Sequence, residues 1–464
     1  MSKTRQRNEK LAAVIAETGW SHAQLALAFG RVAAERRSEG QAGVGRSHVS
    51  HWVAGSRPSG SAPDILVETL SRRLGRTVTA DEIGLTPLVS SPILDWNADT
   101  LTALVDLGRS TLDVERRSVL LAAGYSVAAL TLPDQAWWDQ LSDRSARHRK
   151  LNGGRLVGAG DLDAVRETVQ LFTRIDQRRG GGHARAAVVQ YLTSDVAGYL
   201  RASYTDDSVR QGMFSTAGEL AYLIGWMAFD NSEHAIAQRY FAVAVKLAAE
   251  ANDAPLAAHI LRAMAHQAVD LRHHRQAVRI AEASLDGRRY DDASPRERSL
   301  IGVVHARALA VDGQRAAATR ALLRAETDLA SATAGDDEPG RVFFFGEASL
   351  AHETACTLRD MGDLVSATQE FQRSVRTRKA AMFTRTHAVT LGYLGAVQAR
   401  SGSIEEACGT WSEALDVMDG IHSGRARQAV RDMRSSLSVY RAKGIRSVAE
   451  LDGRAARYLA AVDR

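Results

Sequence analysis

At 464 residues the chain is too long for a single hydrophobic core, so two or more cooperative units are expected. Apolar residues make up 45% and charged residues 24% of the chain, values that exclude wholesale disorder and a membrane bundle. Residues 1–85 hold 12 Lys and Arg against 8 Asp and Glu, a local net charge of +4 in a chain whose total is +5. This bias indicates that the N-terminal segment meets a polyanion, although an excess of this size also arises by chance.

The cysteine content and the N-terminus bear on location. Cys356 and Cys408 are too few for a disulfide framework and too far apart for a metal motif, so we expect reduced, buried thiols. The first ten residues are polar and no apolar stretch follows them, which is unlike a secretory signal. We therefore expect a cytoplasmic, nucleoid-associated protein with no membrane partner.

Apolar positions recur three and four residues apart along almost the whole chain, and strand-like alternation is nearly absent. This period predicts an all-α fold. A Pro- and Ser-containing stretch after residue 85 and a charged, Gly-containing stretch before residue 161 mark the boundaries. We expect a first domain over 1–85, a helical linker region over 86–160 and a repeat domain over 161–464.

The first domain begins with a helix from Asn8 to Glu17 that stops at Gly19. A second helix is expected after Ser21, where Ser21 and Gln24 have the spacing of a capping box. Leu25, Leu27, Ala28 and Val32 are its predicted apolar positions, and it should continue to about Arg37. Three glycines between Gly40 and Gly45 then predict a loop.

A short helix is predicted from Arg46 to Ala54, ended by Gly55 and Pro58. Val49, Trp52 and Val53 share one side of this helix, and Ser47, Ser50 and His51 lie on the other. An apolar side that anchors the helix and a side of short polar groups is the arrangement that a DNA recognition helix needs.

The motif GRSHVSHWVAGSRP at 45–58, followed by a helix over 64–74 and by GRTVTADEIGL at 75–85, resembles the lambda-repressor-like (Xre-type) DNA-binding domain. The resemblance implies a helix-turn-helix whose third helix enters the major groove of double-stranded DNA. Matched by position, the residues that would face DNA are Arg46, Ser47, His48, Ser50 and His51, with Arg57 on a phosphate.

Two features depart from that family. The loop between the second and third helices is longer, and apart from Arg46 the third helix lacks the Arg, Asn or Gln that make bidentate base contacts. Specificity would then need a dimer or DNA shape. Lys3, Arg5 and Arg7 fit a basic arm that adds phosphate contacts or, equally, a solvated terminus. The alternative for the whole domain is a helical unit whose polar helix has no DNA role or binds protein.

From about residue 216 the sequence repeats. Small residues recur at Ala237, Ala277, Ala318, Ala367 and Ala407, and bulky or apolar ones follow four residues later at Phe241, Ala281, Leu322, Phe371 and Trp411. Twelve residues before the first set stand Gly225, Ala265, Ala306, Ala355 and Gly395. This is the tetratricopeptide pattern of paired helices, and it predicts a tetratricopeptide-like α-solenoid. Gly313, Gly362 and Gly402 are expected in the turns within pairs.

The segments RRGGGHAR at 178–185, GWMAFD at 225–230 and AQRYF at 237–241 resemble actinobacterial helix-turn-helix/tetratricopeptide regulators of differentiation and antibiotic production. Together with the first domain, this resemblance covers most of the chain. It implies a sequence-specific transcriptional regulator, a repressor or pleiotropic regulator, whose repeats mediate homodimerisation and effector or partner binding.

If the first helix of each pair lines the concave face, that face carries aromatic, His and Arg side chains suited to an anionic small molecule or an acidic peptide. The predicted groove residues are Tyr222, Trp226, His259, Arg262, His266, Arg307, His352 and Arg359. The alternative is that these groups are ordinary solvated or capping residues and that the groove serves subunit packing.

The sequence has no P-loop, complete dinucleotide fingerprint, nucleophile elbow or spaced metal-ligand set. We therefore expect no enzymatic activity, no cofactor and no metal. The competing function is a tetratricopeptide scaffold that acts by sequestering another regulator.

Overall fold

The computed structural model describes residues 7–35, 43–76, 78–85, 94–113, 116–117, 120, 125–126, 130–138, 140–141, 156–333, 338–441 and 446–462. These residues are overwhelmingly helical. Among them the only strands are β1 (Leu156–Val157) and β2 (Ser203–Tyr204), which pair in parallel. The predicted all-α fold is confirmed. No helix in this part of the chain is both long and apolar enough to cross a bilayer.

Four helices form a compact N-terminal unit: α1 (Glu9–Thr18), α2 (His22–Glu35), α3 (Arg46–Val53) and α4 (Ala62–Leu74). Gly19 ends α1 with a φ of 68°, a left-handed conformation that glycine adopts without strain. The expected capping box precedes α2, because Ser21 Oγ accepts from the Gln24 amide at 3.3 Å and Gln24 Oε1 accepts from the Ser21 amide at 2.9 Å.

The unit has its own core, separate from the rest of the protein, with Leu11, Leu25, Val49 and Ile65 fully buried. One sequence expectation fails here. Leu27 is 63% exposed, whereas Phe29 is fully buried. A residue two positions after Leu25 lies about 200° around the helix, so it cannot share the face that Leu25 buries.

The segment 86–160 is described only in part. Its helix α5 (Thr100–Leu112) packs against α12 and α9, and Leu104 and Leu107 are fully buried in the core of the large body. The Tyr240 hydroxyl also lies 3.2 Å from Thr111 Oγ1. This helix is thus a layer on the body rather than an extended connector.

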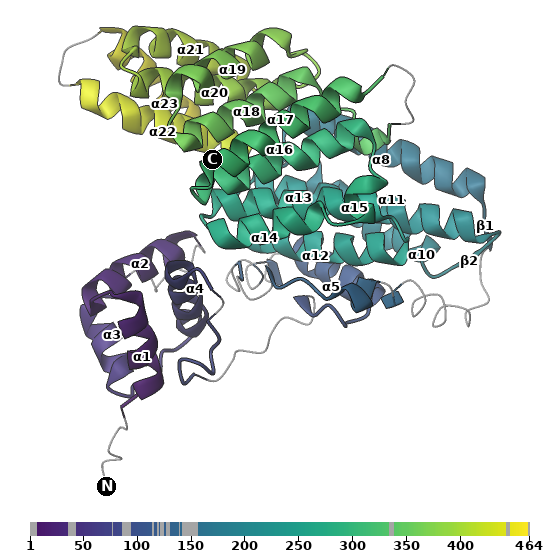
Figure 1. Ribbon diagram of the computed structural model, residues 1–464, viewed down its shortest axis with the longest axis horizontal. Coiled ribbons are helices and arrows are strands. Elements are labelled where there is room, and N and C mark those ends of the chain that lie inside the picture. Colours follow the sequence, from purple (N-terminus) through teal and green to yellow (C-terminus); the bar gives the residue numbers. More distant parts are fainter. Residues whose placement is uncertain are drawn as a thin grey trace.

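The body is built from consecutive helix pairs (Figure 1). These are α11 (Asp207–Asp230) with α12 (His234–Glu250), α13 (Ala254–Asp270) with α14 (His274–Ser284), α16 (Pro295–Val311) with α17 (Arg315–Ser331), α18 (Glu347–Met361) with α19 (Leu364–Thr377), and α20 (Thr384–Arg400) with α21 (Ile404–Val417). A sixth pair, not predicted, is α22 (Gly424–Arg441) on α20 with α23 (Arg446–Val462) on α21. Short helices fill the insertions, namely α15 (Arg288–Asp291) and η4 (Gly340–Val342).

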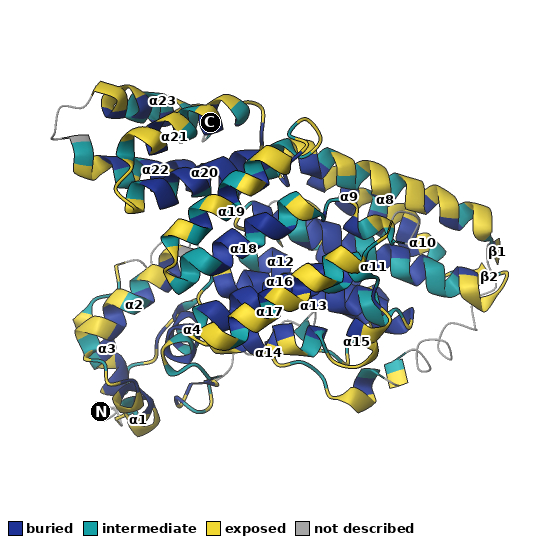
Figure 2. Cartoon of the chain, turned by 45° about the horizontal axis from the view of Figure 1, so that its top comes forward, coloured by how far each residue is buried: buried dark blue, intermediate teal, exposed yellow. Residues whose placement is uncertain are grey.

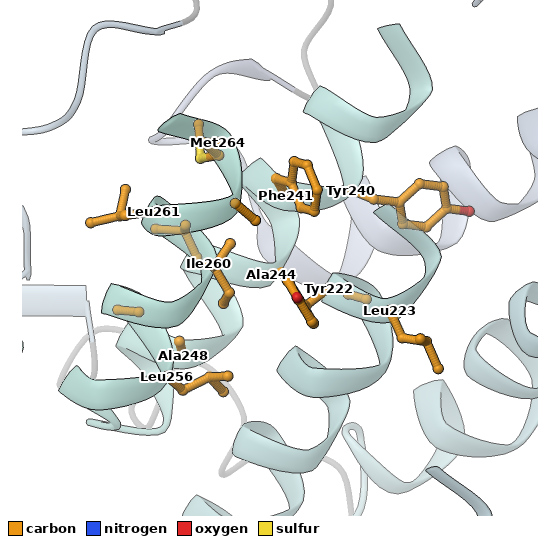
Figure 3. Packing of buried hydrophobic residues seen from close by; sticks show 14 of the residues in the cluster. Tyr222, Leu223, Tyr240, Phe241, Ala244, Ala248, Leu256, Ile260, Leu261 and Met264 are labelled. Carbon is orange, nitrogen blue, oxygen red and sulfur yellow. The ribbon is translucent and has the colours of Figure 1, made fainter. Parts of the chain in front are cut away.

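The repeat register explains how each pair closes. All five alanines of the second helices, from Ala237 to Ala407, are completely buried. A Cβ added to Gly225 would lie 2.7 Å from the Phe241 ring, and one added to Gly395 would lie 2.5 Å from the Trp411 ring. At these two positions glycine leaves room for the aromatic ring of the second helix, whereas Ala355 holds the equivalent position in the pair that contains Phe371. Figure 3 shows Phe241 among the packed side chains, with Tyr240 pointing the other way.

The predicted turn glycines Gly313, Gly362 and Gly402 have φ values of 86°, 86° and 91°. In the first two pairs, Ser232 and Arg272 hold the equivalent positive φ at 62° and 63°. A side chain in this conformation is strained, so these two turns are held by the packing around them.

Before the pairs come α8 (Ala159–Arg179), α9 (Arg185–Tyr191), η3 (Leu192–Val196) and α10 (Ala197–Tyr199). Helix α8 packs against both α11 and α20, although these two helices are far apart in sequence. At its C-terminal end, His422 donates its amide to the Arg179 carbonyl at 2.7 Å. One side of α8 remains exposed, whereas α12 and α13 are almost wholly buried (Figure 2). Helix α8 therefore joins the first and the fifth helix pairs.

Candidate functional sites: the polar face of α3 and a covered cavity

Helix α3 has the two faces that the sequence predicts. Val49 is fully buried, and Trp52 packs against Phe29 of α2 with ring centroids 5.4 Å apart. Arg46, Ser47 and His48 are exposed. His51 on α3 and Arg57 after it are exposed as well. Lys3 and Arg5 lie outside the described residues, and Arg7 makes an exposed ion pair with Glu9 at 3.4 Å.

Two of the polar side chains have structural partners. Ser50 donates to the Arg46 carbonyl at 3.0 Å and lies 2.9 Å from His22 Nδ1, so it links α3 to α2. His48 Nδ1 accepts from the Gly45 amide at 3.2 Å, which caps the start of α3. The freest groups on this face are therefore Arg46, Ser47 and His51.

The N-terminal unit meets the body through α4, not through α3 (Figure 1). Glu68 Oε1 lies 3.1 Å from His273 Nε2 in the turn between α13 and α14, and Arg72 Nε lies 2.9 Å from the same carboxylate oxygen. The His273 ring also stacks on Tyr125 at 5.3 Å. This docking leaves the polar face of α3 pointing away from the repeats.

A cavity of about 530 Å³ lies inside the body, between the first helices of the pairs, α8 and the segment around η4. Five of the eight predicted groove residues line it: Tyr222, Trp226, Arg262, His266 and His352. The other three lie behind this wall. His259 packs edge-on against Tyr222 at 4.7 Å, Arg307 lies 3.0 Å from Asp270, and Arg359 lies 5.4 Å from the Tyr393 ring.

A buried ionic cluster fixes α8 at one side of the cavity. Arg385 donates to Asp230 at 2.9 Å and to Asp176 at 3.1 Å, and both carboxylates are completely buried. Burial raises the pKa of Asp176 to about 6 despite Arg385. Burial acts the same way on Asp230, but Arg385 and Arg425 outweigh it and hold that pKa below its usual value. The cluster joins α8, α11, α20 and α22.

A second cluster holds η4 in place. Arg341 donates to Glu297 at 2.7 Å and to Glu219 at 3.2 Å, and it lies 3.7 Å from Asp253. Burial disfavours the charged form of Glu297, but Arg341 and His259 outweigh it and lower the pKa to about 2. One arginine thus ties this segment to α11, α16 and the turn before α13.

The histidines of the cavity supply no positive charge. Burial, and after it the nearby Arg307, lowers the pKa of His266 well below its usual value, and burial followed by Arg378 does the same for His352. Burial also lowers the pKa of His259 to about 4. These rings are neutral near pH 7, so cationic character in the cavity comes from arginine. No group of three or more potential metal ligands occurs among the described residues.

Sequence reasoning missed Arg341, Arg378, Arg385 and Arg425, all of which line the cavity. Arg341 lies in an insertion and Arg378 in the turn before α20, so the repeat register does not reach them. Arg385 does lie in a first helix, where it is the only arginine or lysine of the first turn, and this was an available signal.

The N-terminal unit matches a known family. The family described as the SP15 N-terminal domain matches residues 11–86, which run from α1 through α4 to just beyond Leu85. The chain has no significant match among curated proteins.

Proposed function

We propose that this chain is a sequence-specific DNA-binding transcriptional regulator of the repressor or pleiotropic type. In this proposal α2 and α3 form a helix-turn-helix, and the tetratricopeptide-like body mediates homodimerisation and effector or partner binding. The observation that carries the proposal is the division of α3 into a side buried by Val49, Trp52 and Val53 and an exposed side with Arg46, Ser47 and His51.

The chemistry of the exposed side fits a nucleic-acid groove. Arg46 has the donor geometry for a guanine edge, and short Ser47 and His51 side chains let the helix approach the bases closely. Arg57 follows the helix at a position suited to a phosphate. Because an eight-residue helix with one arginine reads few base pairs, specificity requires two copies bound to a palindromic site.

The test is selection of bound sites from random double-stranded DNA with the full-length protein, followed by affinity measurements at several salt concentrations. We expect an enriched palindrome. Arg46→Ala should weaken binding to it by about 1–3 kcal/mol and relax the sequence preference. Arg57→Ala should weaken binding to all sequences alike and reduce the salt slope by about 1.

Arg320→Ala is the matched control, because Arg320 is an exposed arginine on α17 of the body and its loss should leave both properties unchanged. Absence of any enriched sequence, together with wild-type behaviour of Arg46→Ala, would contradict the proposal. Recovery of a stoichiometric protein partner without DNA would instead favour the scaffold function.

A further inference from the structure

Two buried arginines of the cavity have no carboxylate partner. Arg262 is 2% exposed and Arg378 is 8% exposed, and both line the cavity. Within the described part of the chain, no acidic side chain lies within ion-pair distance of either. In the same wall Arg341 and Arg385 each contact at least two carboxylates. Arg262 and Arg378 are thus buried arginines of this wall that form no ion pair within the described residues, although Glu353, which also lines the cavity, favours the charged form of Arg378.

The bonds that these two arginines make are to neutral groups. Arg262 donates to the Tyr222 hydroxyl at 2.8 Å and lies 3.1 Å from His259 Nε2. Arg378 donates to the Ala348 carbonyl at 2.8 Å and to Ser374 Oγ at 3.0 Å. The Nε of each guanidinium is buried without a partner. Burial lowers the pKa of Arg378 to about 10, which still leaves it charged at neutral pH.

A buried charge outside an ion pair is costly, and strongly perturbed charged groups cluster at functional sites. Two buried guanidiniums in the wall of one cavity, neither of them in an ion pair, form a site for an anion such as a carboxylate, phosphate or sulfonate. His266 and His352 in the same wall add no charge, and Nε2 of His266 and both ring nitrogens of His352 already contact other protein groups.

Part of the wall is aromatic, beside polar residues and the carboxylates Asp176, Glu219, Asp253 and Glu353. The ring centroid of Phe343 lies 6.2 Å from that of Phe344 and 5.9 Å from that of Phe383, and all three residues line the cavity. Trp226 lines it too, with the Arg262 guanidinium 5.4 Å from its ring. A flat apolar group is the natural occupant of such a surface.

We propose that this cavity is the binding site for a small organic anion with a flat apolar portion, held by Arg262 and Arg378. A volume of about 530 Å³ is that of a small-molecule site. Helix α8 packs against both α11 and α20 and lines the cavity, so it bounds the cavity on that side. The site is the effector site of the regulator proposed above, so its biological purpose rests on that function, but binding itself is measurable without DNA.

The experiment compares two ligands of the same shape, 2-naphthoate and the neutral 2-naphthamide, by calorimetric titration of the full-length protein. We expect the carboxylate to bind about tenfold to hundredfold more tightly, because hydrogen bonds to a charged group are worth that much more. Equal affinities, or no binding of either compound at millimolar concentration, would overturn the proposal. This comparison uses the wild-type protein and so does not depend on a variant that folds.

Variants then locate the site. Arg262→Met and Arg378→Met should each reduce the preference for the carboxylate severalfold, whereas Arg320→Met on the exposed side of α17 should retain it. A preference for naphthoate that survives in both cavity variants would place the anion elsewhere and overturn the assignment. Since no step involves DNA, failure here leaves the proposed DNA binding intact, and failure of DNA selection leaves this result intact.

Discussion

Single small residues decide whether the helix pairs of the body close. Gly395 sits under the Trp411 ring, whose Nε1 donates to the Gly392 carbonyl at 3.0 Å and so fixes the ring in place. The ring cannot move aside without breaking this bond. By contrast, Gly409 on α21 is exposed, and a Cβ there would meet no atom within 4 Å.

These two glycines predict opposite effects of the same substitution. Gly395→Ala should destabilise the protein by about 1–3 kcal/mol, because the added methyl overlaps the Trp411 ring. Gly409→Ala should stabilise it by up to about 1 kcal/mol, because alanine restricts the unfolded chain and favours the helix. Urea unfolding followed by circular dichroism measures both. A stabilising Gly395→Ala would show that the pair tolerates a wider spacing than the structure has.

Buried histidines make the stability of the body depend on pH. Burial, and after it Arg324, lowers the pKa of His305 to about 4 from the usual 6.5. Between these values the unfolded chain binds a proton that the folded protein does not, so stability falls as the pH falls from 6.5 toward 4. The pKa values of His234 and His259 are also lowered, and burial is again the main cause. Asp176 has the opposite effect on stability. Its pKa is raised in the folded protein, so the folded protein binds a proton more readily than the unfolded chain and gains stability as the pH falls below 6.

The variant His305→Leu tests how much His305 contributes to the dependence of stability on pH. The wild-type protein should lose about 2 kcal/mol at this residue between pH 6.5 and pH 5, and the variant should not. The measurement is the free energy of unfolding in urea at both pH values. His51→Leu, which removes an exposed histidine of α3, is the control and should retain the wild-type dependence. An equally steep dependence in His305→Leu would mean that His305 titrates alike in both states.

At the scale of elements, the sequence predicted best where local rules act. The start of α2 follows from the Ser21 and Gln24 spacing, and the split faces of α3 follow from the position of Trp52. The five predicted pairs follow from small residues in register. The sixth pair was not predicted because α22 and α23 do not repeat that register. The position of α8 was not predicted because no local sequence signal indicates which distant helices it contacts.

The ionic cluster around Arg385 holds α8 against the helix pairs. Arg385→Met would leave Asp176 and Asp230 buried near a single remaining arginine, Arg425, whose Nε lies 3.5 Å from Asp230. Removing one partner of a buried ionic cluster costs about 3–5 kcal/mol. We expect a loss of that size in urea unfolding.

Two further variants test the cause. Arg400→Met, on the exposed end of α20, should change stability by less than about 0.5 kcal/mol. The double variant Arg385→Met with Asp176→Asn should recover part of the loss, because the amide no longer has to be buried as a charge. If the double variant were as unstable as the single one, lost packing rather than stranded charge would be the reason.

At the scale of the whole molecule, the cavity combines residues separated by more than two hundred positions. The first helices supplied its predicted members, from Tyr222 to His352, because they repeat. Arg166 and Asp176 on α8 and Arg425 on α22 join them only through tertiary packing. The contact between the N-terminal unit and the body also arises only from tertiary packing, because no sequence signal pairs Glu68 with His273.

Loss of this contact should change the shape of the protein rather than its fold. His273 is buried between Glu68 and the Tyr125 ring, and its replacement removes the contact between α4 and the turn before α14. His273→Ala should weaken the docking by about 1–3 kcal/mol, because it leaves a buried carboxylate with one partner fewer. Small-angle X-ray scattering should then show a larger maximum dimension, while circular dichroism shows unchanged helix content.

His274→Ala is the matched control, because this half-buried first residue of α14 is next to His273 but lies outside the contact with Glu68. In a dimeric regulator the docking would also set the distance between the two copies of α3, and hence the spacing of half-sites that both can reach at once. His273→Ala should therefore bind operators of several half-site spacings with similar affinity, where the wild-type protein prefers one. A wild-type scattering profile and an unchanged spacing preference would show that other contacts hold the unit in place.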